Sequence, residues 1–217
     1  ADFAETTANA IGADAMLVRV GAYCHDIGKT AAPRMFVENQ DPDEDSPHNA
    51  MTPEQSAAAI MGHVVEGVHI LREEGVPEDV VAFAYSHHGT SLIDFFWQKH
   101  LTEHPEHPAD ETAFRYPGQV PASRETGVLM LADAVEAAAR TVDPPDRTGF
   151  QRTVERVVSA KLRQGQLDDS GLSIADLHVM VDTMVHLLVN MHHGRVKYPS
   201  DVGLSVVPGS ANAPRRG

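Results

Sequence analysis

The sequence predicts an all-α protein, because signals for helix ends recur along the chain while strand patterns are nearly absent. Residues 52–55 place a capping threonine before a proline and end on a glutamine that completes a capping box. Ser173 and Asp176 form a second box of this kind. Alternation typical of a strand occurs only weakly, near residues 202–207. Together with the spacing of apolar residues, these signals predict a helical bundle.

The individual elements follow from the same signals in chain order. The predicted helices cover residues 3–11, 14 to about 28, 53–74, 77–88, 92–100, a segment that Ser123 caps and that contains Asp133, 147–164 and 173–192. The apolar positions expected in the second helix are Met16, Leu17, Val20 and Tyr23. Residues 39–50 predict an acidic loop, and an irregular insertion is expected near residues 102–121.

The chain opens inside a helical pattern, which predicts an N-terminally truncated domain over residues 1–199. Residues 200–217 are rich in proline, glycine and serine and predict a loose C-terminal tail. A domain of this length can bury a substantial hydrophobic core.

The composition limits the class of partner. Asp and Glu number 31 against 17 Lys and Arg, so the formal net charge is −14. A surface this acidic repels the phosphate backbone of long nucleic acid, but a small anionic ligand can still bind in a local positive pocket. Cys24 is the only cysteine, which excludes an internal disulfide and indicates a cytosolic chain. We find no signal peptide and no apolar run of membrane-spanning length.

The strongest functional signal is the HDIGK run at residues 25–29. The carboxylate of Asp26 has two oxygens, so it can bridge two metal ions while neighbouring histidines complete each ion's shell. The other candidate ligands come from separate predicted helices: His25, His63, His87, His88 and Asp133. In the apolar helix around Asp133, a lone carboxylate is costly unless it is paired or metal-bound. This set predicts a metal-dependent phosphodiesterase in which two ions activate a hydroxide.

Each of these residues also has an ordinary structural interpretation. An inward histidine such as His63 is more often a hydrogen-bonded core residue, and a His-His pair can be a polar helix terminus. Taken together with the HDIGK run, the metal interpretation is favoured. Most other histidines are assigned no role: His48, His100, His104 and His107 in polar loops, and His69, His178 and His186 on helix faces. His192 and His193 resemble a second ligand pair, but we favour a substrate-side or structural role for them.

Beyond this pattern, five segments carry a resemblance to a known family: residues 12–30 (GADAMLVRVGAYCHDIGKT), 36–40 (FVENQ), 87–96 (HHGTSLIDFF), 114–118 (FRYPG) and 128–140 (VLMLADAVEAAAR). They resemble the HD-domain phosphohydrolase superfamily and, more specifically, its PgpH-type cyclic-di-AMP phosphodiesterases. The resemblance covers about residues 3–199. It implies an HD-domain helical bundle with a dinuclear metal site. It also implies the cytoplasmic domain of a bacterial inner-membrane protein with an extracellular domain and seven transmembrane helices.

The resemblance also implies the distribution of ligands. His25, Asp26 and Asp133 would hold one divalent ion, and Asp26, His63, His87 and His88 the other. Members of the family typically use iron or manganese. By spacing, the family's first histidine would fall just upstream of Ala1, so the resemblance implies that the first ion lacks one ligand here.

The implied reaction is hydrolysis of cyclic-di-AMP to pApA, with Asp26 and Lys29 as the catalytic side chains. Lys29 would clamp a phosphate or protonate the leaving 3′-oxygen. Basic and aromatic residues that we place near the mouth of the site are Arg115, Tyr116, Arg195, Lys197 and Tyr198. HD-GYP phosphodiesterases, which cleave cyclic-di-GMP, follow their His-His with glutamate, whereas His88 here is followed by Gly89.

Two alternatives stay open. The first is another HD phosphohydrolase that acts on cyclic-di-GMP, (p)ppGpp or a nucleotide. The second is a non-catalytic domain that senses a nucleotide and signals through a membrane. We expect membrane association only through a transmembrane region upstream that this sequence does not include. The oligomeric state stays open, and a homodimer is one alternative.

Overall fold

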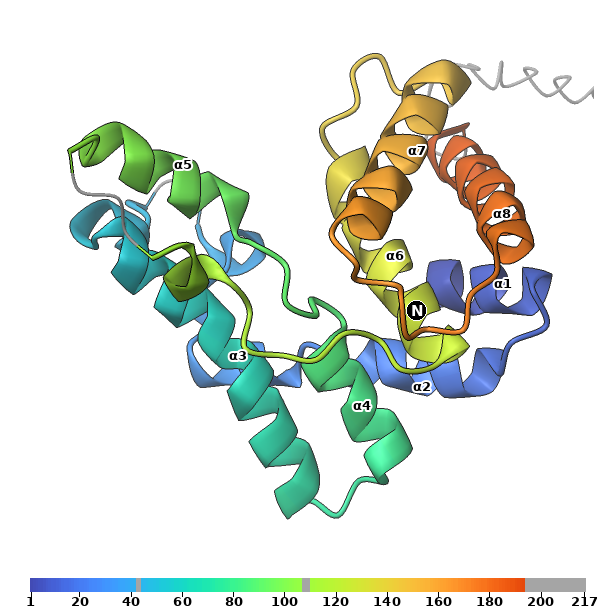
Figure 1. Cartoon of the computed structure of the whole chain (residues 1–217), viewed down its shortest axis with the longest axis horizontal. Coiled ribbons are helices and arrows are strands. Elements are labelled where there is room, and N and C mark those ends of the chain that lie inside the picture. Colours follow the sequence, from blue (N-terminus) through green and yellow to red (C-terminus); the bar gives the residue numbers. More distant parts are fainter. Residues whose placement is uncertain (42–43, 107–109, 194–217) are drawn as a thin grey trace, which may run out of the picture.

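The computed structural model describes residues 1–41, 44–106 and 110–193 (Figure 1). Its α-helices are α1 (Asp2–Ala10), α2 (Ala15–Cys24), α3 (Pro53–Glu73), α4 (Glu78–Ser86), α5 (Asp94–Glu103), α6 (Arg124–Ala139), α7 (Arg147–Arg163) and α8 (Ile174–His193). Short 3-10 turns lie between them: η1 (Ile27–Ala31), η2 (Pro33–Met35), η3 (Val37–Asn39), η4 (Pro47–Ala50) and η5 (Glu111–Phe114). Among these described residues the only β-type pairing is one isolated bridge between Leu92 and Arg115. The all-α prediction is confirmed.

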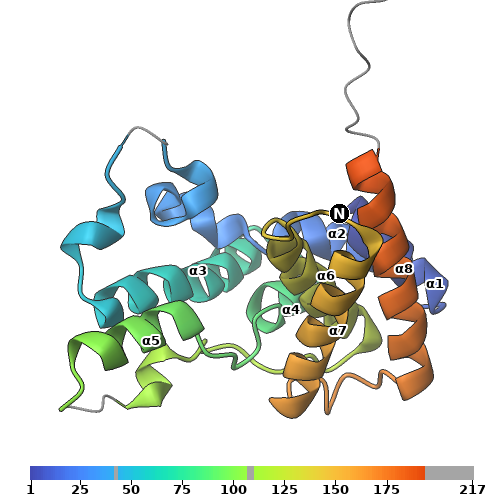
Figure 2. The ribbon, with the colours of Figure 1, turned by 90° about the horizontal axis from the view of Figure 1, so that it is seen from above.

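The helices form two groups that meet along α2 and α4. In Figure 1, α3 and α5 lie on the left, and α1, α6, α7 and α8 lie on the right. The view from above separates the same two groups (Figure 2). α2 contacts both α4 and α6, and α4 also packs on α3, so the two short central helices connect the halves.

Each group has its own apolar core. The larger core includes fully buried side chains from five helices: Val18, Phe83, Met130, Leu131, Phe150, Met180 and Met184. The smaller core, between α3, α5 and η5, contains Ala57, Phe96 and Phe114. Burying large apolar side chains of this kind contributes about 1.5–3 kcal/mol each relative to exposure. The ends of α2 and α4 are therefore held between two packed bodies.

Side-chain caps fix where the helices begin, as the sequence predicts. Asp14 accepts a hydrogen bond from the backbone N–H of Leu17 at the start of α2. Thr52 and Gln55 form a reciprocal capping box at α3, and Ser123 caps α6. Ser173 and Asp176 form the predicted box before α8, with the Asp176 N–H donating to Ser173 Oγ over 3.1 Å. Such caps contribute about 1 kcal/mol each.

The second predicted helix is wrong in where it ends, and two of its apolar positions face solvent. α2 ends at Cys24 rather than near Gly28, and η1 follows after Asp26. Met16 and Tyr23 are 64% and 65% exposed, whereas Val18 and Gly21 face the core. Helical spacing is the same for an exposed apolar stripe as for a buried one, and here the buried face is the one on which Phe83 packs against Gly21.

Two further expectations need correction. His100 lies in α5 rather than in a polar loop, is 5% exposed and is ion-paired with Glu54. Residues 174–192 do have the length and the mean hydropathy, 1.3, to cross a membrane. Length and composition alone are weak evidence for a span, and Met180, Met184 and other side chains of α8 are buried in the larger core. The predicted tail over 200–217 lies outside the described residues.

The glycine of the HDIGK run allows η1 to lie directly on α3. A Cβ at Gly28 would come 2.0 Å from the backbone oxygen of His63 and 2.5 Å from the backbone nitrogen of Gly67. Any side chain at this position would therefore push the two backbones apart. This contact keeps Asp26, just before η1, next to His63 in the middle of α3.

Candidate metal centre

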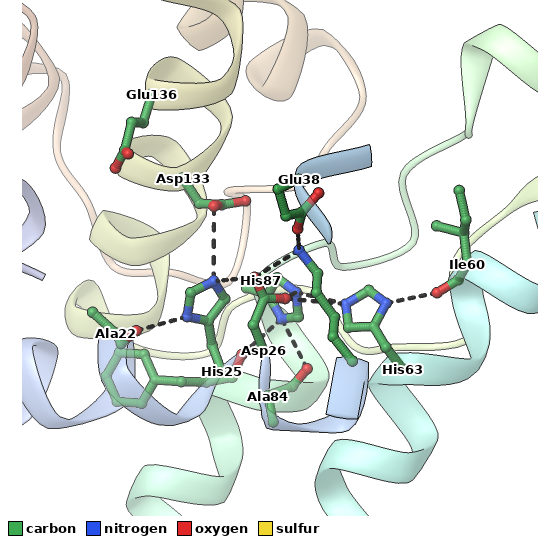
Figure 3. A network of polar contacts seen from close by, with 12 residues as sticks. Ala22, His25, Asp26, Glu38, Ile60, His63, Ala84, His87, Asp133 and Glu136 are labelled. Carbon is green, nitrogen blue, oxygen red and sulfur yellow. Dashed lines mark hydrogen bonds and ion pairs between the residues drawn. The ribbon is translucent and has the colours of Figure 1, made fainter. Parts of the chain in front are cut away.

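Four segments of the chain bring the six predicted ligands together. His25 follows the last residue of α2, and Asp26 lies between α2 and η1. His63 comes from the middle of α3, and Asp133 from α6. His87 and His88 follow α4. Figure 3 shows His25, Asp26, His63, His87 and Asp133 converging on one point between the two halves of the molecule.

Asp26 is at the centre, and its two carboxylate oxygens face different groups. Oδ2 of Asp26 lies 3.3 Å from Nε2 of His25. The same nitrogen of His25 lies 3.7 Å from Oδ1 of Asp133. Oδ1 of Asp26 lies 3.5 Å from Nε2 of His63 and 3.6 Å from Nε2 of His87. The carboxylate is therefore oriented as a bridge between two sets of potential ligands.

The imidazole rings are aimed by the backbone. Nδ1 of His25 donates a hydrogen bond to the carbonyl of Ala22, and Nδ1 of His63 donates to the carbonyl of Ile60. Nδ1 of His87 donates to the carbonyl of Ala84 over 2.9 Å. Since a carbonyl only accepts, each Nδ1 carries the hydrogen, and each Nε2 points into the centre.

These constraints leave lone pairs facing one another, which fits a cation. The Nε2 atoms of His63 and His87 are 3.1 Å apart, and with the hydrogen on Nδ1 of each neutral ring no proton lies between them. Among the described residues, the buried Oδ1 of Asp26 has no hydrogen-bond partner. Buried polar atoms are normally satisfied, so a site with this many unshared donor atoms can hold a divalent metal ion.

Two three-residue groups have the spacing of a ligand set. The ligand atoms of His63, His87 and His88 lie within 4.8 Å of one another, and so do those of His25, Asp26 and His87. His87 therefore contributes to both groups. Asp133 joins the second group through His25. Imidazole and carboxylate together suit Fe, Mn, Co or Zn, and the donor set alone does not select one of them.

The protonation states of the inner histidines also suit metal binding. Burial, together with the positive charge on His25, lowers the pKa of His87 to about 3. Burial likewise lowers the pKa of His63 and takes that of His88 well below its usual value. These three imidazoles are neutral at pH 7, which is the form that coordinates a metal.

His25 has the opposite shift. Burial alone would lower its pKa, but the carboxylates of Asp133 and Asp26 raise it to about 10. In the metal-free protein, His25 is therefore protonated at neutral pH and supplies positive charge between two carboxylates. The same charge helps to keep the pKa of Asp26 below its usual range, against the effect of burial.

We expect metal binding to release a proton from His25 and to tighten as the pH rises toward about 10. The protonated form stabilises the metal-free fold fully below pH about 6.5, and this contribution is lost as the pH rises through about 10. Calorimetric titration with Mn²⁺ at pH 7.5, in buffers of different ionisation enthalpy, measures the protons released. His69→Gln, which removes an exposed histidine outside the centre, should leave that number unchanged. Binding without proton release would contradict this assignment.

The open side of the centre is formed by carboxylates. The side chains of Asp26 and Asp133 are each 32% exposed, whereas those of His63 and His87 are at most 1% exposed. Solvent therefore reaches the centre from the carboxylate side. There, Nζ of Lys29 lies 2.8 Å from Asp26 and 2.7 Å from Glu38, which keeps the ammonium at the entrance.

The residues predicted to bind substrate differ in whether the structure describes them and in what they contact. The ring of Tyr116 stacks on that of His88, a predicted metal ligand, with centroids 4.1 Å apart. Arg115 is occupied by Glu111 and by the carbonyl of Thr90, to which its guanidinium donates over 3.1 Å. Arg195, Lys197 and Tyr198 lie outside the described residues. The roles of these residues in substrate binding stay predictions.

Two residues beside the centre could not be found from the sequence. Gln166, 2% exposed, accepts a hydrogen bond from the N–H of Thr90 and donates to its hydroxyl, which fixes the loop after His88. Lys161 in α7 donates a hydrogen bond to Ser91 in the same loop. In both contacts the two residues are at least 70 positions apart in the sequence, so no local sequence pattern predicts them.

Comparison with known proteins gives concordant results. The family model of the HD domain matches residues 1–138. The chain is 37% identical to the cyclic-di-AMP phosphodiesterase PgpH of Bacillus subtilis over 199 residues, and 35% identical to that of Listeria monocytogenes over 201. These matches cover 92% and 93% of this chain but only 28% of each relative, so the chain spans just over a quarter of their length.

A solved structure agrees in fold. The HD domain of L. monocytogenes PgpH in complex with cyclic-di-AMP superposes with a TM-score of 0.83 at 34% identity. The match covers 88% of this chain and 87% of that domain. The predicted HD-domain bundle is confirmed: the chain belongs to the HD domain family.

Proposed function

We propose that this chain hydrolyses cyclic-di-AMP to linear pApA with the aid of two divalent cations. The observation that carries the proposal is the Asp26 carboxylate, whose two oxygens face separate groups of inward-pointing imidazoles. Support for the substrate comes from the similar PgpH domain, which was solved with cyclic-di-AMP bound. The acidic surface elsewhere is consistent with a small ligand rather than a nucleic-acid polymer.

The ligands in this proposal are those that the sequence predicts. His25, Asp26 and Asp133 would hold one cation, and Asp26, His63, His87 and His88 the other. A cation pair supplies Lewis-acid activation of a phosphodiester and lowers the pKa of an attacking water. Iron or manganese is the proposed metal, because carboxylate and imidazole ligands accept both.

Lys29 is proposed to bind the phosphate that is cleaved. Burial alone would lower its pKa, but Asp26 and Glu38 raise it, so the ammonium is charged at neutral pH. Of its two predicted roles, this favours clamping the phosphate by charge-assisted hydrogen bonds over releasing a proton to the leaving oxygen. Nζ also lies 5.1 Å from the centre of the Phe36 ring, a distance at which the ring attracts the ammonium.

We further propose that the chain is the cytoplasmic catalytic part of a larger bacterial inner-membrane protein. Its match to only 28% of each PgpH relative supports a domain of a longer protein. A homodimer is compatible with this arrangement.

The test is a panel of substrates on the 217-residue chain after reconstitution with Mn²⁺ or Fe²⁺. We expect cyclic-di-AMP to yield pApA faster than cyclic-di-GMP, (p)ppGpp or dNTPs are consumed, with about two metal ions bound per chain. Chromatography of the products and elemental analysis provide these measurements. Preferential turnover of another nucleotide would favour a different HD phosphohydrolase, and binding of cyclic-di-AMP without any turnover would favour a nucleotide sensor.

A further inference from the structure

A lysine on α7 has a position that the metal centre does not explain. Lys161 is half-buried, and Nζ donates a hydrogen bond to Oγ of Ser91 over 2.7 Å. Among the described residues, no carboxylate forms an ion pair with it. Transfer of an ammonium from water is costly without a counter-charge, so this position needs a compensating interaction.

The hydrogen bond places Lys161 against the loop that follows the His-His pair. The N–H of Ser91 donates to the carbonyl of His88, and the carbonyl of Ser91 accepts from the N–H of Tyr116. Asp133 and Asp94 act on the ammonium only at longer range, and its pKa is lowered by burial. The ammonium is thus held beside the centre without being neutralised.

A favourable interaction with the helix dipole does not explain the burial. Cations near the C-terminus of a helix are stabilising, and Lys161 and Arg163 both lie in the last turn of α7. Arg163 is exposed and provides this charge without losing its hydration. Lys161 loses hydration and gains only a hydroxyl partner, which leaves two ammonium hydrogens for another acceptor.

We propose that Lys161 binds a second phosphate of the substrate beside the metal centre, while Lys29 binds the phosphate that is cleaved. This inference rests on the proposed function, because a cyclic dinucleotide carries two phosphates. Lys29 comes from η1 and is paired with Asp26, whereas Lys161 comes from α7 and reaches the loop after His88. Two lysines from different parts of the fold thus lie near predicted ligands, Lys29 beside Asp26 and Lys161 beside the loop that follows His88.

The test compares substrates with one and with two phosphates. The Mn²⁺-loaded chain is assayed with cyclic-di-AMP and with bis(p-nitrophenyl) phosphate, a diester that has a single phosphate. Lys161→Met keeps the aliphatic length and removes the charge. We expect it to raise KM for cyclic-di-AMP about 10- to 100-fold, as for loss of a charge-assisted hydrogen bond, and to raise KM for the one-phosphate diester much less.

Equilibrium binding provides a readout that does not depend on turnover. Calorimetry on the metal-free chain should show a rise of similar size in the Kd for cyclic-di-AMP with Lys161→Met. Lys161→Arg should restore most of the affinity. Arg163→Ala, which removes an exposed cation from the same helical turn, is the matched control and should leave both KM values unchanged.

The outcomes separate this inference from the proposed function. Equal KM values for cyclic-di-AMP in Lys161→Met and the wild type overturn the inference alone. An equal fall in kcat on both diesters also overturns it, because Lys161 would then act on the centre itself. Failure of the wild type to bind or hydrolyse cyclic-di-AMP overturns the proposed function together with the inference. Should Lys161→Met fail to fold, Ser91→Ala, which removes the acceptor that positions Nζ, provides the same comparison of substrates.

Discussion

Asp26→Ala should abolish hydrolysis of cyclic-di-AMP, lowering kcat/KM by at least about a thousandfold, and should reduce the metal content to one ion or none. The substitution removes the two oxygens that face His25 on one side and His63 and His87 on the other. Without them, each cation would lose a ligand and the carboxylate that joins the two sets. Formation of pApA and elemental analysis of the purified chain measure the two effects.

Asp182→Asn is the matched control for this experiment. Asp182 is exposed on α8 and lines a groove between α7 and α8. In the sequence, the nearest predicted metal ligand is Asp133. Loss of the Asp182 carboxylate should leave both turnover and metal content unchanged. If Asp26→Ala kept two bound ions and full activity, the bridging role of this carboxylate, and the two-metal proposal with it, would be wrong.

Gly28→Ala should destabilise the fold by about 3 kcal/mol or more, with a fall in Tm on the order of 10 °C. The added Cβ would lie 2.0 Å from the backbone oxygen of His63, and backbone atoms cannot turn away as a flexible side chain can. Thermal unfolding of the metal-free chain measures the effect. The separation of η1 from α3 should also weaken metal binding, because Asp26 and His63 lie on either side of this contact.

Gly62→Ala provides the comparison. Gly62 is also in α3, next to His63, but a Cβ there would have no neighbour within 4 Å. Alanine is the better helix former, so this substitution should raise stability by up to about 1 kcal/mol. Similar Tm values for the two variants would show that the close contact at Gly28 is not what holds η1 on α3.

Local signals predicted most of the helices correctly. Asp14, Thr52, Ser123 and Ser173 are all caps in the structure, because a side-chain oxygen that satisfies a free N–H acts within a few residues. The six proposed ligands come together for a related reason. A polar residue in an apolar helix, such as Asp133, is costly unless it faces other polar groups, so its type already indicates where it points.

Features set by distant contacts could not be predicted. The outward face of α2, with Met16 and Tyr23, shows the same spacing as an inward face. The roles of Lys161 and Gln166 depend on a loop at least 70 residues earlier in the chain. His100, predicted to lie in a polar loop, packs instead against Trp97 and Phe114 and is buried.

The groups that aim the three imidazoles are main-chain atoms, and this affects how the centre tolerates mutation. Each of His25, His63 and His87 donates to the carbonyl three residues before it, at Ala22, Ile60 and Ala84. No change of side chain at those three positions removes the acceptor. In metal sites that orient histidine through a carboxylate, one substitution can delete the support. Here the helical backbone sets the orientation of each ring. Side-chain substitutions at Ala22, Ile60 and Ala84 should therefore leave the rings in place as long as the helical turns still form.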